Sequence, residues 1–129
     1  MDLTDLKKTE FELKESVQLY KALYHESPDM YVSVSPKDAS VIECNKTLLN
    51  KTGYTRDEVV GHPVFDIYHP DCLSDAEKVF SQFVKTGVVL DKKLILKTKS
   101  GGRINVNLNV KAVNNAHGEI MYSISSFRD

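Results

Sequence analysis

The feature that most constrains the fold is the strict alternation of apolar and polar residues near the end of the chain. In residues 103–110, the apolar side chains are Ile104, Val106, Leu108 and Val110, and each is followed or preceded by a polar one. Successive side chains of a strand point to opposite faces, so the pattern predicts a strand with one buried and one hydrated face. Such strands are typical of antiparallel sheets.

Four further segments fit the same sheet. Each is rich in β-branched, aromatic or alternating apolar residues and is bounded by Gly, Pro, Asn or Asp. Glycines 101 and 102 place a hairpin turn directly before the alternating strand. The predicted partner strands cover residues 30–35, 40–44, 88–99 and 119–127.

The segment between the second and third predicted strands is divided into short helices. Asn45 suits a helix N-cap, and Gly53 suits the left-handed position after a helix. Thr55 and Glu58 have the spacing of a capping box. A longer amphipathic helix is predicted over residues 73–86, with Ser74 or Asp75 as its cap. Strands grouped apart from helices predict an α+β fold in which helices cover one face of an antiparallel sheet.

The first 26 residues predict one long amphipathic helix. Its seam repeats at alternating spacings of three and four, as in a coiled coil, and Ser27–Pro28 ends it. Two interpretations remain open: the helix folds back on its own sheet, or it dimerises and carries a signal. We expect two units, a dimerisation helix over residues 1–26 and a globular domain over residues 27–129. The seam consists of Leu3, Leu6, Glu10, Leu13, Val17, Tyr20 and Tyr24.

Charge and composition exclude several classes of protein. The net charge is -1, and no basic run suggests nucleic acid or a membrane surface. The sequence has no apolar run long enough to span a bilayer and no signal peptide, so we expect a cytosolic segment, which a longer chain could still anchor. The histidines lack metal-ligand spacing, and no catalytic grouping is visible. Cys44 is interpreted as a small buried hydrophobe, and Cys72 as either structural or reactive.

Aromatic residues gather in the middle of the chain, where short helices face the predicted sheet. In such a layout the core and any ligand cavity occupy the same volume. Two interpretations remain open, a small-molecule cavity or a filled core. The candidate cavity-lining residues, taken from strand alternation and helix spacing, are Met30, Val32, Ile42, Leu48, Phe65, Tyr68, Phe80, Leu94, Leu108 and Tyr122.

The order of these motifs resembles that of the PAS domain family over residues 26–129. No single motif is specific, but together they occur in the family's order. The resemblance implies a five-stranded antiparallel sheet of order 2-1-5-4-3 with helices on one face. The matching segments are Glu26–Asp29, Asn45, Thr52–Thr55, Glu58–Gly61, His69–Asp71, Ser100–Arg103, Gly118 and Phe127–Asp129.

The resemblance leaves the cofactor open and disfavours three kinds. Residues 62–67 lack the photoreactive cysteine motif of the flavin-binding light sensors, and the chain has no tryptophan of the kind that FAD-binding redox sensors use. Residues 73–86 contain no histidine for an axial haem ligand. Cys72 lies near the attachment point of a covalent chromophore, but the partner Tyr and Glu are not recognisable. Flavin, haem and a covalent chromophore are therefore disfavoured.

The resemblance also implies a role. We expect a non-catalytic sensory module that binds a small ligand or a partner and acts on an output domain beyond Asp129, of the histidine kinase class by family frequency. The alternative is a protein–protein interaction module with a filled core, which dimerises and holds no ligand. An enzyme is disfavoured because no nucleophile, base and orienting group come together in sequence.

Overall fold

The computed structural model describes residues 22–129. Residues 22–26 are helical and lead into the domain, while the rest of the predicted N-terminal helix and most of its seam lie outside the described residues. The elements that follow are β1 (Met30–Val34), β2 (Val41–Cys44), α2 (Lys46–Thr52), α3 (Arg56–Val59), the 3-10 helices η1 (Val64–Ile67) and η2 (Pro70–Cys72), α4 (Leu73–Thr86), β3 (Val88–Lys97), β4 (Arg103–Asn114) and β5 (Ile120–Arg128).

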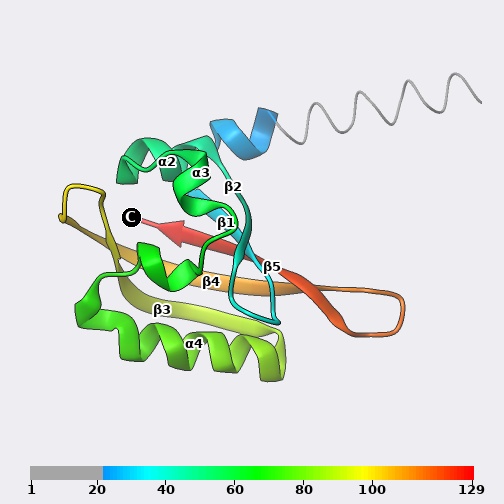
Figure 1. Ribbon diagram of the computed structural model, residues 1–129. Helices are drawn as coiled ribbons and strands as arrows, with labels where there is room; N and C mark the ends of the chain where they lie inside the picture. Colours follow the sequence, from blue (N-terminus) through cyan, green and yellow to red (C-terminus); the bar gives the residue numbers. More distant parts are fainter. Residues whose placement is uncertain (1–21) are drawn as a thin grey trace, which may run out of the picture.

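The five strands form one sheet of order β2-β1-β5-β4-β3, and every neighbouring pair is antiparallel (Figure 1). This confirms the predicted fold class and strand order. The strand with strict apolar–polar alternation lies next to last in the sheet, as β4. Its partner β5 joins it to β1, so the two ends of the described chain, residues 22–30 and 120–129, meet in the middle of the sheet.

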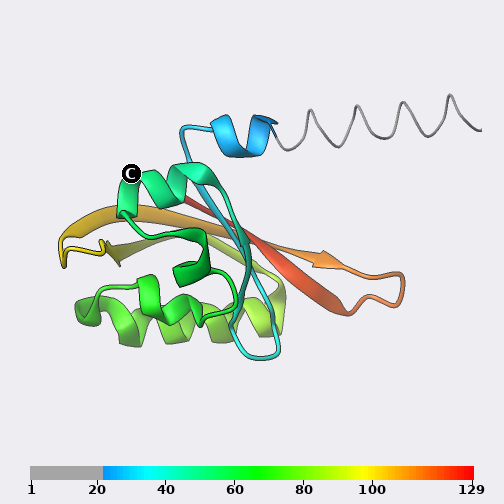
Figure 2. The same cartoon turned by 45° about the horizontal axis from the view of Figure 1, so that its top comes forward.

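Helices α2, α3 and α4 lie on one face of the sheet, and α4 runs along β3 (Figure 2). Alternate residues of β1, β4 and β5 enter the core beneath them; in β4 these are Val106, Leu108 and Val110, as alternation predicted. The hairpin of β4 and β5 extends beyond the helices, and its tip is the predicted turn at residues 114–118.

The predicted caps divide the helical segment as expected. The Asn45 side chain accepts the Leu48 N–H at the start of α2, and Gly53 ends it at a φ of 84°. The capping box of Thr55 and Glu58 opens α3. The predicted cap of α4 is wrong, because η2 runs directly into the helix and α4 begins at Leu73 without a side-chain cap.

The prediction that Ile42 faces the cavity is wrong, because β2 contains a β-bulge. The register between β1 and β2 shifts after Ser33, so that Val34 faces Val41 and one residue of β2 is left over. An extra residue reverses which side chains point inward. Val41 and Cys44 are buried, whereas Ile42, predicted to face the cavity, is 46% exposed.

Among residues 22–129, no helix combines the length and the apolar character that crossing a membrane requires.

Candidate functional site

A cavity of about 30 Å³ lies inside the domain, between η1 and α4 on one side and the central strands on the other. Pockets for drug-sized ligands are usually roughly 300–1,000 Å³, so this cavity suits a few water molecules or a ligand of a few heavy atoms. Its lining is apolar except for Tyr68 and two serines, and it includes no charged side chain. The lining residues are Val34, Val64, Phe65, Tyr68, Ala76, Val79, Phe80, Phe83, Leu108, Val110, Ser123, Ser125 and Phe127.

The ten candidate residues fall into three groups in the structure. Four of them line the cavity: Phe65, Tyr68, Phe80 and Leu108. Four others are buried in the same core but outside this lining: Met30, Val32, Leu48 and Leu94. The remaining two, Ile42 and Tyr122, do not reach the cavity.

Tyr122 lies on the outer face of the sheet, which corrects its predicted position. In β5 the buried residues are Ser123, Ser125 and Phe127, and Tyr122 has the opposite parity. The register explains this, because Phe127 lies opposite Leu108 and Ser125 opposite Val110, both on the core face of β4. Sequence reasoning chose the aromatic residue and missed the serines, although the parity of Phe127 could have shown which face is buried.

The aromatic wall of the cavity is built by η1 and α4. Phe65 and Phe80 meet edge to face with ring centroids 5.9 Å apart, and Phe83 packs against Phe80 at 6.1 Å. From the sheet side, Phe127 meets Tyr68 edge to face at 5.9 Å. Edge-to-face contacts of this kind fix ring orientation. Burial raises the pKa of Tyr68, which keeps its hydroxyl neutral.

The serines occupy the place where β1 and β5 separate. The two strands pair from Met30–Phe127 to Val32–Ser125, and continuing that register would place Ser123 opposite Val34. There the Ser123 hydroxyl accepts the Val34 N–H at 3.0 Å, so a side chain replaces a carbonyl of the ladder. Ser123 and Ser125 are joined by a hydrogen bond of 2.9 Å between their hydroxyl oxygens. The cavity therefore lies over the point where the central seam of the sheet ends.

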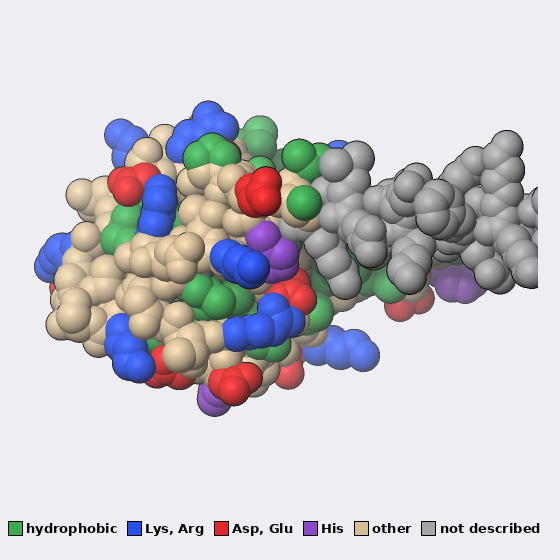
Figure 3. All heavy atoms as spheres, turned by 90° about the horizontal axis from the view of Figure 1, so that it is seen from above, with side chains coloured by type: hydrophobic (Ala, Val, Ile, Leu, Met, Phe, Trp, Pro, Cys, Tyr) green, Lys and Arg blue, Asp and Glu red, His purple; other side chains and the backbone are tan. Residues whose placement is uncertain are grey.

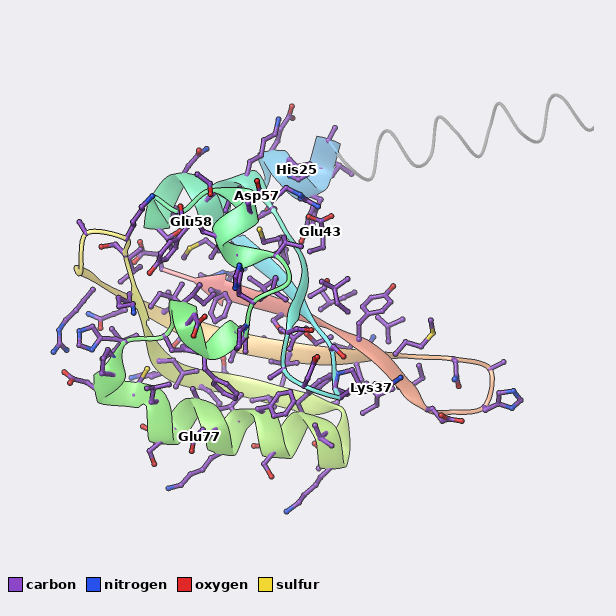
Figure 4. The ribbon with its side chains drawn as sticks, viewed as in Figure 1. His25, Lys37, Glu43, Asp57, Glu58 and Glu77 are labelled. Atoms are coloured by element: carbon purple, nitrogen blue, oxygen red, sulfur yellow. The ribbon has the colours of Figure 1, made fainter. Side chains whose placement is uncertain are left out.

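The opposite end of β1 is closed by Asn45. Its side-chain oxygen accepts the Tyr31 N–H at 3.0 Å and the Leu48 N–H at 3.2 Å. Its amide nitrogen donates to the carbonyls of Tyr24 at 2.8 Å and Asp29 at 3.0 Å. One fully buried amide thus ties the helix before the domain to β1 and to α2. In Figure 4, the labelled His25 lies at this end of the hairpin and Lys37 at the other.

Charged groups surround the Asn45 end but stay on the surface. Arg56 donates hydrogen bonds to both carboxylate oxygens of Glu43, which holds the pKa of Glu43 below its ordinary value of 4.5. The face of the molecule shown in Figure 3 carries interleaved positive and negative side chains, without a large patch of one sign.

The two cysteines are both buried thiols. Burial raises the pKa of Cys44 to about 11, so it remains protonated at neutral pH. The Cys72 sulfur lies 3.2 Å from the carbonyl oxygen and 3.3 Å from the amide nitrogen of Ile95, which fastens η2 to β3. Within the described part of the chain, no group of three or more His, Cys, Asp or Glu side chains could hold a metal ion. Nor does any serine or cysteine there hydrogen-bond to a histidine.

Known proteins with this fold are found by both sequence and structure. The sequence model of the family described as PAS domain matches residues 28–129. No curated protein matches the chain. Among solved structures, a PAS domain from Colwellia psychrerythraea has a TM-score of 0.77 and 16% identity, covering 88% of this chain and 95% of its own.

Two further solved structures have the same fold. The PAS domain of an HTR-like protein from Haloarcula marismortui has a TM-score of 0.71 and 22% identity, covering 94% of this chain and 98% of its own. A domain of a sensory box sensor histidine kinase/response regulator from Geobacter sulfurreducens has a TM-score of 0.72 and 18% identity, covering 91% and 96%. At these identities the structures share the fold. With the family match over most of its length, the chain belongs to the PAS domain family.

Proposed function

We propose that the chain is a non-catalytic sensory module whose cavity takes up a small ligand and whose central strands pass the change to an output domain of the parent protein. The observation that carries this is the position of the cavity over the end of the β1–β5 seam. A ligand there touches a place where a side chain of β5 hydrogen-bonds to the backbone of β1. The PAS family and the sensor histidine kinase domain of similar fold support the same role.

The relay needs a difference between two states. A ligand shifts an equilibrium only by its differential affinity for the two conformations. An occupant that hydrogen-bonds to Ser123 or Ser125 has different affinities for states in which the Val34–Ser123 bond is closed or open, so it shifts the β1–β5 pairing toward the state that it fits better. That change reaches residues 22–29 before β1 and Asp129 after β5. An output domain of the histidine kinase class is the proposed receiver, as the name of the Geobacter protein suggests.

Neighbouring positions on α4 give a matched test. Ala76 lines the cavity, whereas Glu77 is exposed and points away from the sheet in Figure 4. A metabolite library is screened by thermal shift against the wild type and both variants. We expect some compounds to raise the Tm of the wild type and of Glu77→Leu. The same compounds should leave the Tm of Ala76→Leu unchanged, because the larger side chain fills the cavity. A ligand at a hundred times its Kd stabilises by about 2.7 kcal/mol. Compounds that act equally on both variants, or that leave the amide resonances of residues 22–29 and 126–129 unchanged, contradict the proposal.

A second function, dimerisation without a ligand, is favoured by the outer face of the sheet. A groove of about 290 Å³ there is lined by Leu23, Tyr24, Ser27, Tyr31, Val32, Ser33 and Ile124. Leu23 is 64% exposed and Ile124 41% exposed, and clustered apolar side chains on a surface often mark an interaction site. The cavity is also small enough for the domain to act with its core filled by its own side chains.

Sedimentation tests this second function through the predicted helix seam. We propose a concentration-dependent homodimer, and we expect Leu13→Glu and Val17→Glu to shift it to monomer. Gln18→Glu makes the same charge change off the seam and should leave the dimer intact. If the seam variants sediment like the wild type, the seam is not the interface.

A further inference from the structure

The two cavity serines stand at positions where a strand normally presents apolar side chains. Ser123 is 1% exposed and Ser125 5% exposed, and both line the cavity, with Ser125 opposite Val110 and Ser123 opposite Ala112 of β4. A buried hydroxyl costs free energy unless its hydrogen-bonding groups find partners. Within residues 22–129, the hydrogen-bond partners of the two serine hydroxyls are the Val34 N–H and each other.

The pair leaves one hydroxyl hydrogen without an acceptor. The Ser123 oxygen accepts the Val34 N–H, and a single hydrogen joins the two serine oxygens. Each serine carries one O–H donor. Whichever serine donates to the other, the second O–H hydrogen has no acceptor in residues 22–129. Tyr68 also lines the cavity, and its hydroxyl makes no hydrogen bond within that part of the chain.

The other residues that line the cavity restrict the charge and polarity of a ligand. The cavity has no charged side chain, so an ion would lose its hydration without compensation. Phe65, Phe80 and Phe83 offer only apolar surface on the opposite side. A matching ligand is therefore neutral, presents one hydrogen-bond acceptor to the serines and turns an apolar remainder to the rings.

Resting on the proposed sensory function, we propose that the cavity is a site for a small uncharged carbonyl compound, whose oxygen accepts the spare hydroxyl hydrogen of the Ser123–Ser125 pair. The acceptor oxygen lies against the serines, in this space of about 30 Å³. Discrimination comes from one hydrogen bond, because an apolar molecule of the same shape leaves a buried donor unsatisfied.

The test is a nuclear magnetic resonance titration of the whole 129-residue chain with two probes of the same shape, butanone and 2-methyl-1-butene. Only butanone carries an acceptor. We expect saturable shifts of the Val34, Ser123 and Ser125 amides, with butanone binding about 3- to 10-fold more tightly, the range that one hydrogen bond supplies. Equal affinities, or a crystal structure soaked in butanone with only water against the serines, overturn the proposal.

Variants locate the source of the preference. The double variant Ser123→Ala/Ser125→Ala removes both hydroxyl donors and should reduce the preference most, whereas Ser125→Ala alone leaves the Ser123 hydrogen without an acceptor and should retain it. Ser126→Ala changes the next residue of the same strand, whose side chain has the opposite parity, and should leave the preference intact. A preference that is unchanged in the double variant overturns the assignment. If the preference holds while the amides of residues 22–29 do not respond, the carbonyl site stands and the relay fails.

Discussion

At each end of strand β1, a side chain from another part of the chain accepts a backbone N–H of the strand. The two side chains differ in how many of their own hydrogen-bonding groups have partners. At its start the Asn45 side chain accepts the Tyr31 N–H, and at its end the Ser123 side chain accepts the Val34 N–H. Both side chains stand where a backbone carbonyl would complete a ladder. Asn45 uses both acceptor positions and both donor hydrogens. The serine pair keeps one donor hydrogen unused and faces a cavity.

The difference shows where this fold can respond to a ligand. A fully bonded buried amide fixes the surrounding segments, because any movement breaks several hydrogen bonds together. A partly satisfied pair beside empty space can exchange partners at low cost. The domain thus combines a fixed attachment of the preceding helix at one end of β1 with an adaptable closure at the other.

Among substitutions that remove only hydrogen bonds, the largest expected effect is at the fixed end. Asn45→Ala removes the side chain that accepts the Tyr31 and Leu48 N–H groups and donates to two backbone carbonyls, and we expect the free energy of unfolding to fall by about 3 kcal/mol. Urea denaturation measures this fall in the free energy of unfolding. Asn45→Asp retains the acceptor oxygen and loses the two donated bonds, so it should also destabilise. A loss below about 1 kcal/mol for Asn45→Ala would show that the junction is less fixed than its bonds imply.

At the adaptable end the expected effect is smaller and unequal between the serines. Ser123→Ala removes the acceptor of the Val34 N–H and should cost about 1–2 kcal/mol. Ser125→Ala removes only the bond to Ser123 and should cost less than Ser123→Ala. Ser126→Ala serves as the control in the same urea titrations. Equal costs for Ser123 and Ser125 would mean that the Val34 bond does not close the seam.

Acid should weaken the ion pair beside the Asn45 end. The hydrogen bonds from Arg56 depress the pKa of Glu43 in the folded state, so the pair stabilises the fold above pH 4.5, and this contribution is lost as pH falls through the depressed value. Glu43→Gln should therefore destabilise the domain at pH 7 by less than Ser123→Ala does, since the pair is partly exposed. Its difference from the wild type should shrink below pH 4.5, and a difference independent of pH would contradict this.

The smallest expected effect is at Tyr68. Its hydroxyl has no hydrogen bond within residues 22–129, so Tyr68→Phe should change the free energy of unfolding by less than about 0.5 kcal/mol. Removing the ring with Tyr68→Ala should cost about 3–5 kcal/mol, because the ring packs against Phe127. A large cost for Tyr68→Phe would reveal a bonded hydroxyl and leave fewer spare donors in the cavity.

Local chemistry made the fold predictable, and strand registration limited prediction of the site. The caps at Asn45 and Gly53 and the glycine turn at 101–102 act within a few residues, so the sequence shows them directly. Ile42 was misplaced because the bulge in β2 arises from pairing with β1. The serines were missed because polar residues in a strand are normally assigned to the hydrated face. Their parity with Phe127, and the pairing of Ser125 with Val110, place them on the core face.

Amide hydrogen exchange, followed residue by residue in the 129-residue chain, compares the two ends of β1 most directly. After correction for intrinsic rates, we expect the Val34 amide to exchange about tenfold faster than the Tyr31 and Leu48 amides, because its acceptor can leave without breaking a larger network. Slower exchange at Val34, or equal protection at all three amides, would contradict the claim that the serine end of the seam is the adaptable part of this domain.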